Sequence, residues 1–147
     1  MDENEILENE NTEDPETPDT PETQDEPTPT PSSDDSILTS IKKLLGISDD
    51  YTHFDTDIIM HINSAFAVLN QIGVGPNGGF EITDNTSEWS EFVSDERLNT
   101  VRTYVYLTVK ILFDPPSQTS SLETMKEYKK ELEWRLMVAC DPIETTD

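Results

Sequence analysis

The sequence has little cysteine, little positive charge and no long apolar run, and each scarcity removes a class of protein. Its one cysteine, Cys140, excludes an internal disulfide and a cysteine-based zinc site, and fits a reducing compartment. Nine basic residues against 32 acidic ones give a net charge of −23, so nonspecific attraction to nucleic acid or anionic lipid is disfavoured. No apolar run could span a bilayer, and the start MDENEILENE lacks the basic and apolar parts of a secretion signal. We therefore expect a soluble protein that works inside a cell or in a particle assembled there.

Signals for catalysis, metal binding and phosphate binding are also missing. The glycine-rich GVGPNGGF lacks the lysine and the following Ser or Thr of a phosphate-binding loop. His53 and His61, with two aspartates between them, resemble a metal site only superficially, and a structural role for His61 is the commoner case. The serines and threonines lie in caps and linkers rather than beside a base. We expect no enzymatic activity, no cofactor and no metal.

The N-terminal quarter of the chain differs in composition from the rest. Residues 1–36 hold 14 of the 32 acidic residues, six of the ten prolines and no lysine or arginine. Self-repulsion and the shortage of apolar surface predict a disordered acidic tail over residues 1–35. A helical domain is expected over residues 36–142, followed by a short C-terminal tail over residues 143–147. The pair Ile6 and Leu7 is either a docking motif or an isolated apolar interruption of the tail.

From residue 36 onward the pattern predicts a mainly α protein, a small bundle of about four helices. An irregular loop or small hairpin around PNGG is expected between the second and third helices, with a short helical turn at Trp89 and Phe92. The helices themselves are expected between the caps at Ser36 and Gly46, from Asp55 to Gly73, from Asp95 to Phe113, and from the capping residues before Glu123 to about Ala139.

Apolar residues at helical spacing predict which face of each helix is buried. The third helix carries further apolar residues beside its stripe, so we expect it at the centre of the fold, with the fourth helix as its antiparallel partner. The predicted stripes are Ile58, Ile62, Ala65, Leu69 and Ile72 on the second helix; Leu98, Val101, Val105, Thr108 and Leu112 on the third; and Leu122, Met125, Tyr128, Leu132, Leu136 and Ala139 on the fourth.

The turn between the last two helices is specified by FDPP. Pro115 pushes Asp114 toward extended geometry, and Pro115 and Pro116 deny the helix its next hydrogen bonds. Phe113, Asp114, Pro115 and Pro116 are therefore expected to form the hinge of a helical hairpin.

The last helix carries a second apolar face. At about 100° per residue, Trp134 lies roughly 200° from Leu132, with Met137 near it. Tryptophan, methionine and arginine are enriched at protein interfaces, so Trp134, Arg135 and Met137 are candidate contact residues. The alternative is that Trp134 folds under the first helix or the PNGG loop as ordinary core. Arg135 is expected to pair with Asp114 or Glu131, or to reach a neighbouring subunit.

Four segments in this order, DIIMHINSAFAVLNQIGVGP, WSEF, RTYVYLTVKILFDPP and ELEWRL, resemble the head-tail connector or adaptor family of long-tailed phages, also called DNA packaging proteins. The resemblance covers roughly residues 36–142 and excludes the acidic tail. It implies a small, mostly helical virion protein of the phage neck, at the head-tail interface, assembled in the host cytoplasm. Such proteins form a ring, commonly dodecameric, beneath the portal protein.

The ring implied by this resemblance extends the DNA channel and docks the next head-closure or tail-completion protein. DNA passes through it without sequence-specific binding. Trp134, Arg135 and Met137 then become candidate contacts with a neighbouring subunit or the portal, while Trp89 and Phe92 are expected to anchor the loop to the core. A channel lined by carboxylates repels the DNA backbone and lets it slide.

A different class of function also fits the charge. The alternative is an acidic DNA mimic, or a small helical interaction module, that inhibits a host DNA-binding protein. Against it, nearly half of the acidic residues lie in the proline-rich tail, and the helices show mixed charge rather than regular rows of carboxylates.

Overall fold

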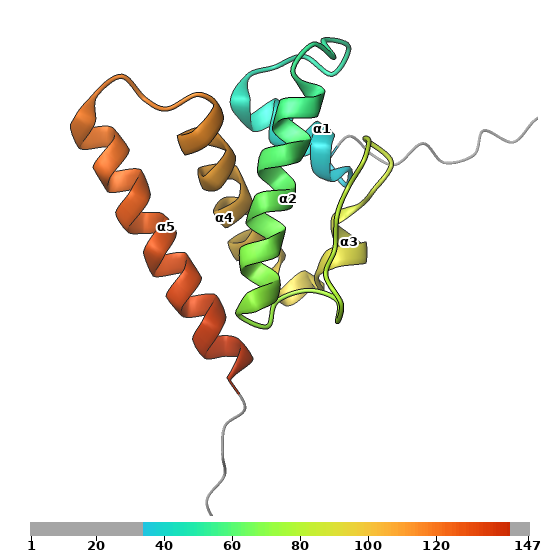
Figure 1. Ribbon diagram of the computed structural model, residues 1–147, viewed down its shortest axis with the longest axis vertical. Helices are drawn as coiled ribbons and strands as arrows, with labels where there is room; N and C mark the ends of the chain where they lie inside the picture. Colours follow the sequence, from blue (N-terminus) through green and yellow to red (C-terminus); the bar gives the residue numbers. More distant parts are fainter. Residues whose placement is uncertain (1–33, 142–147) are drawn as a thin grey trace, which may run out of the picture.

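The computed structural model describes residues 34–141, which form a mainly α, small helical bundle, as the sequence predicts. The tail regions 1–33 and 142–147, which include Ile6 and Leu7, lie outside the described residues. Figure 1 shows α4 between α2 and α5, with α3 and the segment before it on the far side of α2 from α5. The elements of the described chain are α1 (Ile37–Leu45), α2 (Asp55–Gln71), α3 (Trp89–Phe92), α4 (Asp95–Phe113) and α5 (Thr119–Cys140).

The first helix is bounded by side-chain and glycine caps, as its flanking residues predict. Ser36 accepts a hydrogen bond from the Thr39 amide (3.3 Å), so its hydroxyl satisfies one of the free donors of the first turn. At the other end Gly46 adopts φ +77°, and the next amide, of Ile47, donates back to the Lys42 carbonyl (2.9 Å). α1 is therefore short because both ends are closed locally.

The start of α1 is joined to the segment that leads into α3. The Ile37 amide donates to the Ser87 carbonyl (3.0 Å), and the Trp89 amide donates to the Asp35 carbonyl (3.0 Å). These bonds surround an isolated antiparallel bridge between Ser36 and Glu88, and no strand forms elsewhere in residues 34–141. The irregular loop, rather than the small hairpin, is therefore the form that the region between α2 and α3 takes.

α2 and α4 supply most of the core. On α2, Ile58, Ile62, Ala65 and Leu69 are fully buried as predicted, and Ile72 is partly buried. On α4 the buried arc is wide, since Tyr104, Leu107 and Val109 join the predicted stripe members Val101, Val105 and Thr108. A single neighbouring helix does not cover such an arc, so α2 packs on one side of α4 and α5 on another.

Three predicted core positions are wrong. Leu112 is 54% exposed, because it lines an open groove of about 290 Å³ between the end of α4 and the first turns of α5. Tyr128 and Ala139 on α5 are also exposed. On α5 only Leu132 and Leu136 are buried, because α4 is the main helix packed against it and covers a narrow arc of it.

Side chains of α2 hold the long connection to α3 in place of a sheet. The Asn63 amide group bonds both backbone groups of Ile82, donating to its carbonyl (2.9 Å) and accepting from its amide (2.8 Å). The Asn70 side chain donates to the Pro76 carbonyl (3.0 Å). Phe66 stacks on Phe92, with ring centroids 4.3 Å apart. The connection is therefore tied to α2 near both of its ends.

The helical turn predicted at Trp89 and Phe92 is α3. Both side chains are almost completely buried, at 2% and 4% exposure. The Trp89 indole N–H donates to the Ser40 hydroxyl (2.8 Å), so its one polar group is satisfied inside the core. Phe92 also closes over Gly75, where the backbone has φ +98°. These two rings join α1, α2 and the connection to one core.

Gly75 provides the first test of this packing. A Cβ at residue 75 would lie 2.4 Å from the Phe92 ring, whereas a Cβ at Gly78, which has nearly the same φ of +97°, meets nothing within 4 Å. We expect Gly75→Ala to lower the free energy of unfolding by about 3 kcal/mol, and Gly78→Ala by about 1 kcal/mol for the positive φ alone. Urea denaturation followed by circular dichroism measures both. Equal losses in the two variants would contradict the close contact with Phe92.

Candidate interaction surface

The hinge ends α4 and reverses the chain into α5. Asp114 has φ −142° and ψ 67°, outside the helical region, as the proline that follows it requires. Its carboxylate pairs with Lys110 one turn earlier (2.5 Å), and its amide closes the last turn on the Lys110 carbonyl (3.1 Å). Pro115 is exposed and Pro116 is half-buried. The reversal is therefore made by local backbone constraints.

Aromatic rings from the α1–α2 connection pack against the hinge. Phe113 makes an edge-to-face contact with Phe54, with centroids 5.3 Å apart, and Phe54 contacts Tyr51 and His53 at 5.6 and 4.9 Å. His61 lies half-buried on α2. In residues 34–141 no three His, Cys, Asp or Glu side chains are grouped so as to hold a metal ion. In the structure His53 belongs to an aromatic cluster at the hinge.

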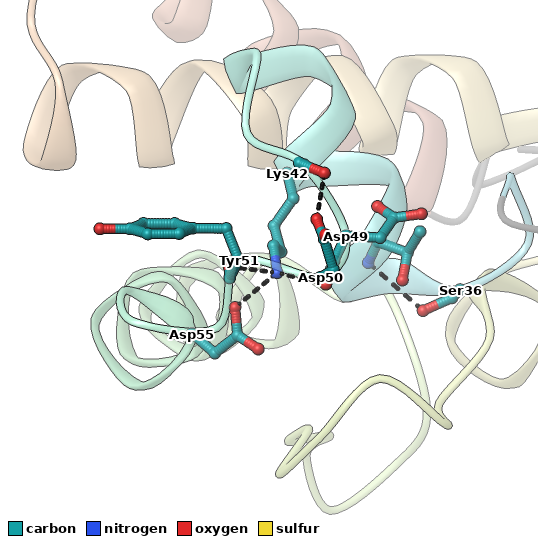
Figure 2. A network of polar contacts seen from close by, with 8 residues as sticks. Ser36, Lys42, Asp49, Asp50, Tyr51 and Asp55 are labelled. Carbon is teal, nitrogen blue, oxygen red and sulfur yellow. Dashed lines mark hydrogen bonds and ion pairs between the residues drawn. The ribbon is translucent and has the colours of Figure 1, made fainter.

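The α1–α2 connection is itself fixed by a buried lysine (Figure 2). Lys42 is only 2% exposed. Its ammonium group donates to the Asp49 and Tyr51 carbonyls (3.1 and 2.8 Å) and pairs with the Asp55 carboxylate (2.8 Å). Three oxygen partners compensate for the loss of water around this charge. The network holds Phe54 at the start of α2 and therefore supports the hinge.

Sequence reasoning missed Lys42, although its position carries a signal. It lies one turn after Leu38 and beside Ile41, on the apolar face of α1, while its neighbour Lys43 is exposed. A lysine on a buried face needs oxygen partners, and the acidic SDDYTHFD that follows supplies them.

Polar contacts join α5 to α4 at two levels. Near the middle, the Tyr104 hydroxyl donates to the Glu133 carboxylate (3.1 Å), and the Lys129 ammonium lies 5.0 Å from the Tyr104 ring centroid. At the end of α5, Arg97 donates to the Cys140 sulfur (3.1 Å) and the Ala139 carbonyl (3.3 Å). An arginine at a helix C-terminus satisfies free carbonyls and interacts favourably with the helix dipole.

Near its C-terminal end, the side of α5 that points away from α4 exposes three large apolar residues, and we call Trp134, Met137 and Val138 its outer face. Their exposures are 59%, 46% and 49%. Trp134 is therefore not folded under α1 or the PNGG loop, which was the alternative that the sequence left open. Met137 lines a shallow hollow together with Ile72 of α2, so the apolar surface continues past the end of α5.

Arg135 has its partner within α5. Its guanidinium Nε donates to the Glu131 carboxylate (3.0 Å), four residues earlier, and both side chains are exposed. Asp114, the other predicted partner, pairs with Lys110 instead. An exposed pair of this kind contributes little to stability, so Arg135 stays available for an additional contact.

The buried Lys42 network yields a prediction with a built-in control. Removing the charge by Lys42→Met leaves the Asp55 carboxylate without its ammonium partner, and we expect the free energy of unfolding to fall by about 3 kcal/mol. Lys43→Met breaks a pair of the same length, 2.8 Å to Asp34, but this pair is exposed and its loss should change stability little. Thermal and urea unfolding of both variants measure the difference; similar values would contradict the structural role of Lys42.

Tyr104 predicts the response of the protein to alkaline pH. Burial, and next the Glu133 carboxylate, raise the pKa of Tyr104 well above its ordinary value of 10. The folded protein therefore keeps this proton where the unfolded chain loses it, and stability falls as pH rises above about 10. Between about pH 10 and 11.5, we expect the free energy of unfolding to fall less steeply with pH in Tyr104→Phe than in the wild type, measured by urea denaturation at each pH. The same slope in both proteins would show that folding does not raise the pKa of Tyr104.

The chain was also compared with known proteins. Residues 37–142 match the family described as phage connector protein. No curated protein and no solved structure matches the chain. None of the helices in residues 34–141 has the length and hydropathy of a membrane span. The family match covers the whole helical domain, from the first residue of α1 to just beyond α5, and excludes the acidic N-terminal region. The chain therefore belongs to the phage connector protein family.

Proposed function

We propose that the protein is a structural subunit of the phage neck, which forms a ring under the portal protein, extends the DNA channel and docks the next neck or tail protein. The ring acts by assembly, without turnover of a substrate. Its site in the virion is the head-tail interface, reached after assembly in the host cytoplasm. Membership of the connector family supports a structural role of this kind in the virion.

The observation that carries the proposal is the uncovered outer face of α5. A helix with two apolar faces in a small monomer leaves one of them in water, and an exposed tryptophan beside methionine is typical of the centre of a protein interface. Trp134, Arg135 and Met137 are the proposed contacts with a neighbouring subunit or the portal. The hinge supports this surface, since Phe113 and the Lys42 network fix the end of α4 from which α5 departs.

The charge of the chain suits a channel through which DNA moves. With a net charge of −23 the subunits repel the phosphate backbone, whereas clustered lysines would retain DNA by release of counterions. Within residues 34–141 acidic residues outnumber basic ones by 18 to nine, so this character belongs to the helical domain as well as to the acidic N-terminal region. DNA is thus expected to pass without sequence-specific binding.

The DNA-mimic alternative has less support. A mimic needs rows of carboxylates at the spacing of phosphates, but the exposed acids of α5 alternate with cations, as in the Glu123–Lys126 and Glu131–Arg135 pairs. Binding of a basic DNA-binding protein that moderate salt abolishes would favour the mimic over the connector.

Native mass spectrometry of the full-length chain tests the proposal. We expect a closed ring of many copies, on the order of a dozen, as the family resemblance implies. Trp134→Ala should shift the distribution toward monomers, because truncation of an aromatic hot spot costs about 2 kcal/mol or more per contact. Tyr128→Ala is the control, since Tyr128 is also an exposed aromatic residue of α5, at 47%, but lies on a different side of the helix from Trp134. A full-length chain that stays monomeric with and without portal protein would contradict the proposal.

A further inference from the structure

Charge is unevenly distributed between the two halves of the described chain. Residues 44–96, which include α2 and α3, contain ten acidic residues and no lysine or arginine. Residues 97–141, which include all of α5 and all but the first two residues of α4, contain seven basic and six acidic residues. In Figure 1 the α2–α3 connection and α5 lie on opposite sides of the α2–α4 pair. One side of the subunit is therefore strongly acidic, and the other carries most of the cations.

The acidic side is hollowed. A pocket of about 480 Å³ lies between α2 and the connection that follows it. This volume is within the range of clefts that hold a small organic group, and the lining is mainly polar. Phe80 and Ala67 supply the apolar part of the pocket lining. The side-chain amide of Gln71 also lines the pocket and forms no hydrogen bond with any of the described residues. Glu81, which is exposed and has no ion pair among residues 34–141, also lines the pocket.

α5 exposes an aromatic ring and a cation that are chemically complementary to this pocket. Trp134 is the most exposed large apolar residue of the described chain, at 59%. Lys130 lies one helical turn before it, exposed and without an ion partner in residues 34–141, and both residues line the same shallow depression on α5. An indole ring with an ammonium group beside it is exposed on α5, and a pocket with a carboxylate in its lining opens beside α2.

We propose that Trp134 of one copy inserts into the α2 pocket of the next copy, with Lys130 pairing with Glu81 of that copy. This inference rests on the proposed ring and names the two surfaces that meet in it. Contact between two different patches is heterologous, the arrangement that generates rings when the rotation closes. The Gln71 side-chain carbonyl, which has no hydrogen bond within residues 34–141, offers an acceptor for the indole N–H, whose burial requires a partner.

Electrostatics favours this pairing over contact between like faces. Copies of a chain with a net charge of −23 repel one another, so a stable contact has to bring cations against acids. Two acidic sides facing each other would juxtapose like charges, which disfavours that contact. The pairing of α5 with the acidic side places Lys130 against the part of the chain that contains no lysine or arginine of its own.

Disulfide trapping in the full-length chain tests the pairing directly. Cys140→Ser removes the native thiol, and Lys130→Cys and Glu81→Cys are then made in separate chains. When the two are mixed under mild oxidation, we expect the 130–81 disulfide to exceed the 130–130 and 81–81 products severalfold. Asp57→Cys, an exposed position near the start of α2, is the control and should form no preferred bond with residue 130. Predominance of 130–130 bonds would overturn the proposal in favour of a two-fold symmetric contact.

Charge reversal gives an independent measurement. Lys130→Glu and Glu81→Lys should each weaken association by about fivefold to tenfold per contact, and the two changes in one chain should restore it. Lys43→Glu and Asp57→Lys make the same charge changes elsewhere and should leave association unchanged. If native mass spectrometry finds the ring but the trapping and charge-reversal results are negative, this pairing is wrong and the ring stands. A chain that never self-associates overturns both.

Discussion

The structure depends on the width of the apolar surface of α4. Tyr104, Leu107 and Val109 extend its buried arc beyond the single stripe that one neighbouring helix covers. α2 therefore packs on one side and α5 on another, and α5 becomes an outer layer whose main partner is α4. A helix in that position buries only the narrow arc of Leu132 and Leu136. The outer face of α5 is exposed as a direct consequence.

Polar side chains replace regular sheet hydrogen bonding in fixing the connections of this fold. Lys42 satisfies the carbonyls of the α1–α2 connection, Asn63 pairs with both backbone groups of Ile82, and Ser40 receives the Trp89 indole N–H. Buried polar groups of this kind are costly unless every member has a partner, so they allow few alternative arrangements. The pocket beside α2 and the hinge beside α4 are thereby held in fixed relation to the core.

A fixed relation between two different surfaces is what a ring requires. Small changes in the angle between the projecting and the receiving surface would open a closed ring into a helical filament. The proline-stopped hinge and the Arg97 contacts at the far end of α5 restrain its direction at both ends. In the proposed ring, the separation of acidic and basic residues along the chain would favour head-to-tail contact over contact between like surfaces.

The sequence by itself determined the features that depend on neighbours along the chain. Caps at Ser36 and Gly46, the stop at Asp114 and the periodicity of α2 follow from local backbone constraints, so the helices and the hinge were predictable. Residues 1–33 lie outside the described chain, and the predicted acidic tail stays a prediction there.

Only the tertiary structure decided which faces are covered. Leu112, Tyr128 and Ala139 continue helical apolar patterns, yet they are exposed because no element packs over them. Lys42 is buried because the following loop folds back to supply two backbone carbonyls and the Asp55 carboxylate; the sequence places oxygens nearby, but only the fold brings them to the ammonium group. For Trp134 the sequence did not decide between a buried core position and an exposed contact position. Periodicity gives the direction of a side chain around its helix, but not whether another element packs against that side. The physical reason is that burial is a property of pairs of elements, and the pairing is settled only when the whole core forms.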